Sequence, residues 1–134
     1  MIDKVGLLTI RDGRVLLCRK KRGTSLLILP GGKRELGESS LECLARELRE
    51  ELGEVTAVSP ELVGVYESAA AGDPGKIVRI ELYRAELTGQ ARAQSEIGEL
   101  VWFGVGDDWS VLAPSLREVI FPDLIAREIL WSAW

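Results

Sequence analysis

The 134-residue sequence contains no histidine, only two cysteines and few aromatic residues. The lack of histidine excludes imidazole metal sites, and Cys18 and Cys43 lie too far apart for a paired-thiolate zinc motif. No apolar run of about twenty residues is present, and the N-terminus lacks a signal-peptide pattern. Because scattered cysteines suit a reducing compartment, we expect a cytoplasmic protein that does not enter a membrane.

Positive charge is also scarce, with a formal net charge of −4 and a pI near 5.0. This balance argues against binding to a nucleic-acid backbone. The one basic run, Arg-Lys-Lys-Arg at residues 19–22, either meets phosphate groups or forms the solvated end of a hairpin, which we prefer. The length predicts a single domain, residues 1–134.

A helix is predicted over residues 39–52. Ser39 followed by Glu42 has the spacing of a capping box, and Gly53 stands where a left-handed C-cap residue is expected. At 100° per residue, an apolar stripe collects Leu41, Leu44, Ala45, Leu48 and Leu52.

The adjoining face of this helix is acidic and carries Glu47, Glu50, Glu51 and Glu54, together with Cys43. Like charges three or four residues apart destabilise a helix by roughly 0.2–0.5 kcal/mol per pair. We therefore expect a cation at this face. Oxygen ligands favour a hard divalent ion, so we predict Mg²⁺, with Mn²⁺ as a substitute.

The helix lies inside a longer pattern, G-x5-E-x7-R-E-U-x-E-E-x-G-U, where U is aliphatic. The fixed positions are Gly32, Glu38, Arg46, Glu47, Glu50, Glu51 and Gly53, with Leu48 at the first aliphatic position. This segment resembles the Nudix box. The last aliphatic position falls on Glu54, and Val55 follows one residue late, which leaves the register of the next strand open.

The resemblance implies an α/β fold of the Nudix type, an α/β/α sandwich with a mixed β-sheet between helices. It also implies hydrolysis of a diphosphate linked to another moiety. By the same resemblance, Glu50 and Glu51 are metal ligands, Glu47 is a ligand or a base that orients water, and Arg46 holds a glutamate in place. The carbonyl group of Gly31, in the Pro-Gly-Gly segment before the helix, is expected to join the metal shell.

Further site residues are expected outside the box. Family members often recruit a downstream carboxylate, and here Glu96 and Glu99 are both candidates for a metal ligand or general base, with Glu96 preferred. Lys33, Arg19 and Arg79 are the candidates for substrate binding, although Arg79 equally suits a residue that covers a sheet.

The rest of the chain predicts a mixed α/β arrangement. We expect a hairpin of strands 5–10 and 14–19 around Asp12-Gly13, and strands at 26–29, 61–68, 76–87 and 100–103, with a flexible connection at 69–75. A terminal helix is expected from Pro114, broken or kinked at Pro122 and continued through Leu124, Ile125, Ile129 and Leu130.

Aromatic residues add two expectations. Among those available to stack on a base, Trp109 is the least typical of a core position. Trp131 and Trp134 would be costly to expose, so they either cap the core or form the contact of a homodimer.

The preferred substrate is a nucleoside triphosphate, with an oxidised or non-standard purine, cleaved to monophosphate and pyrophosphate. Alternatives are an ADP-ribose or nucleotide-sugar pyrophosphatase and a non-catalytic nucleotide-binding regulatory module. The proline and tyrosine that mark ADP-ribose and dinucleoside polyphosphate subfamilies are absent at the expected distance past the box. An isomerase of isoprenyl diphosphates is disfavoured because its histidine ligands are lacking.

Overall fold

The computed structural model describes residues 1–70 and 73–130. Its strands are β1 (Ile2–Leu8), β2 (Ile10–Arg11), β3 (Arg14–Lys20), β4 (Gly31–Lys33), β5 (Thr56–Ala70), β6 (Asp73–Thr88) and β7 (Ile97–Gly104). Its helical elements are α1 (Ser40–Leu52), the 3₁₀ turn η1 (Trp109–Val111), the π-helical segment η2 (Ser115–Ile120) and α2 (Phe121–Ala126).

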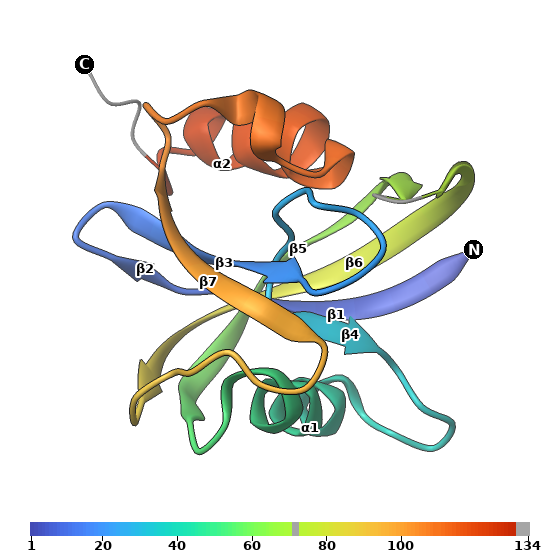
Figure 1. Ribbon diagram of the computed structural model, residues 1–134, viewed down its shortest axis with the longest axis vertical. Helices are drawn as coiled ribbons and strands as arrows, with labels where there is room; N and C mark the ends of the chain where they lie inside the picture. The colour runs from blue at the N-terminus through green and yellow to red at the C-terminus, as the bar shows by residue number, and fades with distance from the viewer. Residues whose placement is uncertain (71–72, 131–134) are drawn as a thin grey trace.

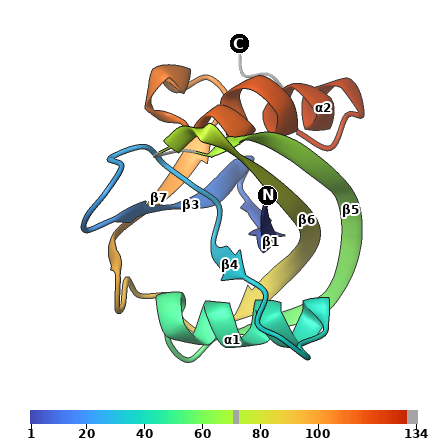
Figure 2. The same ribbon diagram turned by 90° about the vertical axis from the view of Figure 1, so that its right-hand side faces the viewer.

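The strands form two sheets between two helical layers. One sheet is mixed, in the order β4-β1-β6-β5, with β1 parallel to β6, and the other is antiparallel, in the order β2-β3-β7. Helix α1 covers one side of the strands, while η2 and α2 cover the opposite side (Figures 1 and 2). This is the α/β/α sandwich that the resemblance to the Nudix box implies.

Strand β3 has apolar side chains on both of its faces, and each face is covered by a helical layer. Val15 and Leu17 pack into the core on the side of α2, whereas Leu16 and Cys18 pack into the core beneath α1. All four side chains are fully buried. A strand buried on both faces has a continuous apolar sequence rather than an alternating one, as Val-Leu-Leu-Cys does here.

The predicted hairpin at Asp12-Gly13 is confirmed, but its first strand is shorter than expected. Asp12 and Gly13 have φ angles of 53° and 74°, and β2 pairs with β3 across them. Two positive φ angles are typical of a tight hairpin turn. Strand β1 ends before Thr9 and joins the other sheet, so the expected strand 5–10 is divided between two sheets.

Residues 26–29 do not form the expected strand. They make only single bridges, Cys18 with Ile28 and Leu27 with Leu112. Extended pairing begins later, at β4, which is antiparallel to β1 where the sequence predicted only a glycine turn.

The expected flexible connection at 69–75 is mostly strand, since β5 extends to Ala70 and β6 begins at Asp73. At its other end, β5 starts at Thr56. Glu54 is exposed while Val55 packs against the core beneath α1, so the displaced aliphatic residue still takes a core position.

The C-terminal helix passes through Pro122 instead of breaking there. The N–H of Phe121 donates to the carbonyl of Leu116, a π-type bond, and Pro122 follows as the second residue of α2. Proline is tolerated in a first helical turn because its missing N–H is not needed there. Ile129 and Leu130 lie beyond the end of α2, contrary to expectation. Trp131 and Trp134 lie outside the described residues.

Candidate functional site

Helix α1 begins and ends at the predicted residues, although Gly53, with a ψ of −144°, does not adopt the left-handed helical conformation expected of the C-cap. The Ser39 hydroxyl oxygen accepts a 3.1 Å hydrogen bond from the N–H of Glu42, and the Glu42 carboxylate accepts one of 2.9 Å from the N–H of Ser39. Gly53 has a φ of 85°, so the helix ends at a positive φ, and its N–H donates to the carbonyl of Arg49. The capping box therefore fixes where the helix starts.

The buried face of α1 is rotated from the predicted stripe. Cys43, Leu44, Leu48 and Leu52 are buried, whereas Leu41 is 47% exposed and Ala45 is also exposed. The rotation turns the row of residues 43, 47 and 51 toward β4. The Sγ of Cys43 accordingly lies 3.7 Å from the carbonyl oxygen of Gly32 and 3.5 Å from that of Lys33.

Strand β4 lies so close to β1 and α1 that a Cβ at Gly31 would meet the backbone of β1 and a Cβ at Gly32 would meet the Glu47 side chain of α1. Gly31 has a φ of 135°, and a Cβ there would lie 2.1 Å from the carbonyl oxygen of Val5. A Cβ on Gly32 would lie 2.3 Å from the carboxyl carbon of Glu47. The close approach lets the N–H of Gly31 donate a 2.8 Å hydrogen bond to Oε1 of Glu51.

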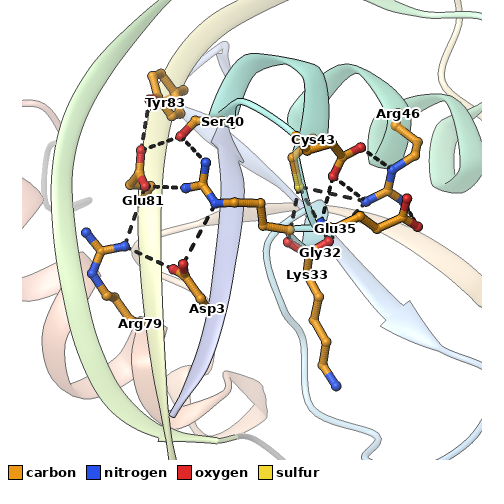
Figure 3. A network of polar contacts seen from close by, with 12 residues as sticks. Asp3, Gly32, Lys33, Glu35, Ser40, Cys43, Arg46, Arg79, Glu81 and Tyr83 are labelled. Carbon is orange, nitrogen blue, oxygen red and sulfur yellow. Dashed lines mark hydrogen bonds and ion pairs between the residues drawn. The ribbon is translucent and has the colours of Figure 1, made fainter.

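Arg46 joins several acidic residues of the helix and the preceding loop. Its guanidinium donates to Glu38 at 2.6 Å and 3.0 Å, to Glu47 at 3.0 Å and to Glu50 at 3.3 Å. It also donates to the carbonyl oxygen of Lys33 at 3.0 Å (Figure 3). The hydrogen bonds from Arg46, followed by one from the backbone N–H of Glu35, lower the pKa of Glu38 to about 2. A planar fork with several donors suits this bridging role.

Glu47 and Glu51 face a cavity of about 360 Å³ between α1, β1, β6 and the segment that leads into β4. Its polar lining comprises Lys4, Lys20, Gly31, Gly32, Lys33, Glu47, Glu51, Glu96 and Ser115. Apolar side chains complete the wall, among them Leu29, Val78 and Ile80. The cavity therefore combines an apolar surface with lysine and glutamate side chains.

Burial dominates the electrostatics of these carboxylates. Desolvation raises the pKa of Glu51 to about 7, against the smaller effect of the Gly31 hydrogen bond, and it also raises the pKa of Glu47. A raised pKa means that the surroundings disfavour the negative charge. A cation beside Glu47 and Glu51 would relieve this cost.

The residues present fit a hard divalent cation. Every candidate donor of the cavity is an oxygen atom, from Glu47, Glu51, Glu96 or a backbone carbonyl. Within residues 1–70 and 73–130, no three His, Cys, Asp or Glu side chains are already grouped so that they could hold a metal ion by themselves. Mg²⁺ commonly uses one or two carboxylates and takes its other ligands from substrate phosphates and water, which matches this set.

Of the other acidic residues expected to bind the metal, one lines the cavity and two do not. Glu96 lines the cavity, but Glu99 forms an ion pair with Arg19 and does not line it. Glu50 is 53% exposed and pairs with Arg46, so it also lies outside the cavity lining.

Two of the expected substrate-binding residues lie elsewhere. Arg19 pairs with Glu99 and donates to the carbonyl oxygen of Ser25. Arg79 contacts Asp3 at 2.9 Å and Glu81 at 3.5 Å (Figure 3), because alternation along β6 places it on the opposite face from Val78 and Ile80. Of the three candidates, only Lys33 lines the cavity.

Sequence reasoning overlooked Lys4 and placed Lys20 in a solvated hairpin end, yet both line the cavity. A signal for Lys4 was present: it shares a strand face with Ile2, Gly6 and Leu8, where an apolar residue is expected. Trp109 is instead part of the core, since its ring packs edge-on at 5.7 Å against Phe121 and its N–H donates to the carbonyl oxygen of Val105.

The α/β/α sandwich and the glutamate-lined cavity are the features expected of a Nudix protein, and comparison with known families supports this class. Residues 2–118 match the family model described as the NUDIX domain. The chain belongs to the Nudix family, as the resemblance of its box predicted.

Three relatives illustrate the range within the family. An uncharacterised Nudix hydrolase, YvcI, of Bacillus subtilis is 37% identical over 72% of this chain and 61% of its own length. An ADP-ribose pyrophosphatase of Methanocaldococcus jannaschii is 29% identical over 72% of this chain and 58% of its own length. A CTP pyrophosphohydrolase of Escherichia coli is 33% identical over 76% of this chain and 75% of its own length. The match thus spans less than two thirds of the first two relatives.

A solved structure agrees on the fold. The solution structure of the E. coli ORF135 protein is 30% identical, with a TM-score of 0.74 over 95% of this chain and 92% of its own. Among the residues described, none of the helices combines the length and apolar character that a membrane crossing requires.

Proposed function

We propose that this protein is a Mg²⁺-dependent Nudix pyrophosphohydrolase that cleaves a nucleoside triphosphate to the monophosphate and pyrophosphate. The observation that carries the proposal is that Glu47 and Glu51, two carboxylates with raised pKa, line one cavity together with Lys4, Lys20 and Lys33. Such a cavity suits a metal ion together with a polyanion.

In this proposal Glu47 and Glu51 hold the cation, and the carbonyl group of Gly31 assists them. Glu96, which lies on the cavity wall, is a further ligand or the group that accepts a proton from the attacking water. Glu50 acts less directly, through its contact with Arg46. When bound, Mg²⁺ supplies charge relief at the phosphoryl oxygens and a lower pKa for water.

Arg46 is a positioning residue rather than a group that touches substrate. Its guanidinium holds Glu47 and the carbonyl oxygen of Lys33 at once, and these groups come from α1 and β4. Gly31 fixes Glu51 by its N–H. The two contacts hold both carboxylates in place before any substrate binds, which limits reorganisation during the reaction.

For the nucleobase we favour an oxidised or non-standard purine, because the segment Pro-Asp-Leu-Ile-Ala-Arg at residues 122–127 resembles small MutT-like members of the family, which hydrolyse nucleoside triphosphates. The named activity of the E. coli relative, hydrolysis of CTP, supports a triphosphate, whereas that of the M. jannaschii relative supports ADP-ribose as the competing substrate.

The test is release of phosphate or pyrophosphate from a panel of nucleotides with Mg²⁺. The panel holds the common triphosphates, an oxidised guanine triphosphate, ADP-ribose and a dinucleoside polyphosphate. We expect turnover of a triphosphate that falls at least about a hundredfold in Glu51→Gln.

Glu54→Gln is the matched control, because Glu54 is exposed just beyond the helix and should leave turnover unchanged. Tight nucleotide binding without turnover, equal in both variants, would refute the enzyme and favour a regulatory binding module. Turnover of ADP-ribose alone would refute the triphosphate substrate.

A further inference from the structure

Lys4 and Lys33 are direct neighbours across two antiparallel strands. In the pairing of β1 with β4, the Cα of Lys4 stands opposite that of Lys33. Residues directly opposite in an antiparallel pair project from the same face, and like charges there are destabilising. Figure 3 shows the Lys33 side chain extending away from the contacts that its backbone makes with Arg46 and Cys43. The two ammonium groups are thus directed to one cavity.

None of the three lysines that line the cavity forms a direct ion pair with a carboxylate among the described residues, although Glu47 and Glu51 line the same cavity. Within residues 1–70 and 73–130, the ion pairs use other cations, namely Arg19, Arg34, Arg46, Lys76, Arg79, Arg117 and Arg127. Lys4 is partly buried, and burial together with Lys20 and Lys33 lowers its pKa, against smaller opposing effects of Glu51 and Glu47. The net balance at Lys4 still disfavours its charge, so a further anion bound beside the three lysines would be stabilised.

A second, smaller cavity continues from the first. Its volume is about 230 Å³, and it shares Lys4, Lys20, Ile28 and Ala70 with the larger cavity. Arg22, Gly23, Thr24 and Asp73 complete its lining. Lys4 and Lys20 therefore stand between the glutamates of the candidate site and a neighbouring cavity that holds one more arginine.

We propose that Lys4 and Lys33 form a cross-strand clamp which, with Lys20, binds a phosphate group attached beyond the diphosphate that is cleaved. This lysine clamp is a substrate-binding site that favours substrates with a longer phosphate chain. It rests on the proposed function, because that function places the diphosphate beside Glu47 and Glu51.

The consequence is discrimination between two classes of substrate. A triphosphate chain can reach both the glutamates and the Lys4–Lys20 boundary of the second cavity. A diphosphate bonded on both sides to organic groups offers the clamp no further charge. The enzyme should therefore prefer triphosphates to diphosphate-linked sugars.

The experiment measures binding of inorganic tripolyphosphate and of pyrophosphate by calorimetry with Mg²⁺, in the full chain. Neither probe requires nucleotide turnover. The variants are Lys4→Met, which keeps most of the apolar body of the side chain, and Lys76→Met as the control with the same change of charge. Lys76 is 64% exposed and lines neither cavity.

We expect Lys4→Met to weaken tripolyphosphate binding by at least about tenfold and pyrophosphate binding by less than about threefold. Its melting temperature without ligand should stay close to that of the wild type, because the lost repulsion from Lys20 and Lys33 offsets the lost attraction to Glu47 and Glu51. A lysine that serves only the fold would instead lower the melting temperature and leave the preference between probes unchanged.

Equal binding by Lys4→Met and Lys76→Met would overturn the clamp, and so would equal losses for both probes. If Lys4→Met fails to fold, Lys4→Arg and Lys20→Met replace it, with the preference for tripolyphosphate retained in the first and reduced in the second. Lys4-dependent binding of tripolyphosphate in a protein that hydrolyses no nucleotide would support the clamp and refute the proposed function.

Discussion

The backbone N–H of Gly31 donates a 2.8 Å hydrogen bond to Oε1 of Glu51 and so joins β4 to α1 at the candidate site. The bond depends on a backbone conformation that only glycine adopts readily, at a φ of 135°. The glycine before the box thus has a structural task, which is to bring a backbone donor to a half-buried carboxylate.

Replacing Gly31 by alanine should therefore reduce stability strongly. The new Cβ would lie 2.1 Å from the carbonyl oxygen of Val5, which is backbone and cannot move aside easily. We expect the free energy of unfolding to fall by at least about 2 kcal/mol in urea denaturation. Gly37→Ala is the control, because Gly37 has a φ of 83° but open space around it. Equal losses in the two variants would show that the close contact does not matter.

The pKa of Glu51 predicts how stability depends on pH in metal-free protein. Its folded value of about 7 lies above the ordinary 4.5, so its stabilising contribution is present below pH 4.5 and is lost as the pH rises to about 7. In EDTA, Glu51→Gln should match the wild type near pH 4 and exceed it by up to about 3 kcal/mol near pH 8.

Thermal or urea denaturation across this pH range measures the difference, with Glu54→Gln as the exposed control. Parallel curves for the wild type and Glu51→Gln would contradict a desolvated carboxylate at position 51.

Arg46→Lys tests whether activity requires the several hydrogen bonds that the guanidinium group donates. Lysine keeps the charge but cannot hold Glu38, Glu47 and the carbonyl of Lys33 together, so activity should fall by about 10–100-fold. Arg49→Lys on the same helix is the control, because its side chain is exposed. Steady-state kinetics measures both, and an Arg46→Lys enzyme as active as the control would exclude a positioning role.

The two downstream glutamates should differ sharply. Glu96 lines the cavity, whereas Glu99 is paired with Arg19 outside it. We expect Glu96→Gln to lower kcat/KM by about a hundredfold and Glu99→Gln to leave it within about threefold. The reverse order, measured with the same substrate and Mg²⁺, would show that Glu99 is the carboxylate that joins the site.

Local features were the most predictable from the sequence. The capping box of Ser39 and Glu42 and the turn at Asp12-Gly13 depend on residues a few positions apart, and both form as predicted. The rotation of α1 was not predictable from its apolar stripe. It follows from packing against β4, where Cys43 contacts the carbonyl oxygens of Gly32 and Lys33, while Leu41 stays exposed.

The amino-acid sequence by itself determined the family, the helix with its glutamates and the glycines before it, because these features depend on residue identity at fixed spacing. Tertiary structure decided which charged groups meet. It brought Lys4, Lys20 and Glu96 to the cavity of Glu47 and Glu51 and directed Arg19 and Arg79 to other partners. The physical reason is that strand pairing and sheet alternation set the neighbours of a side chain, and both depend on contacts between segments far apart in the chain.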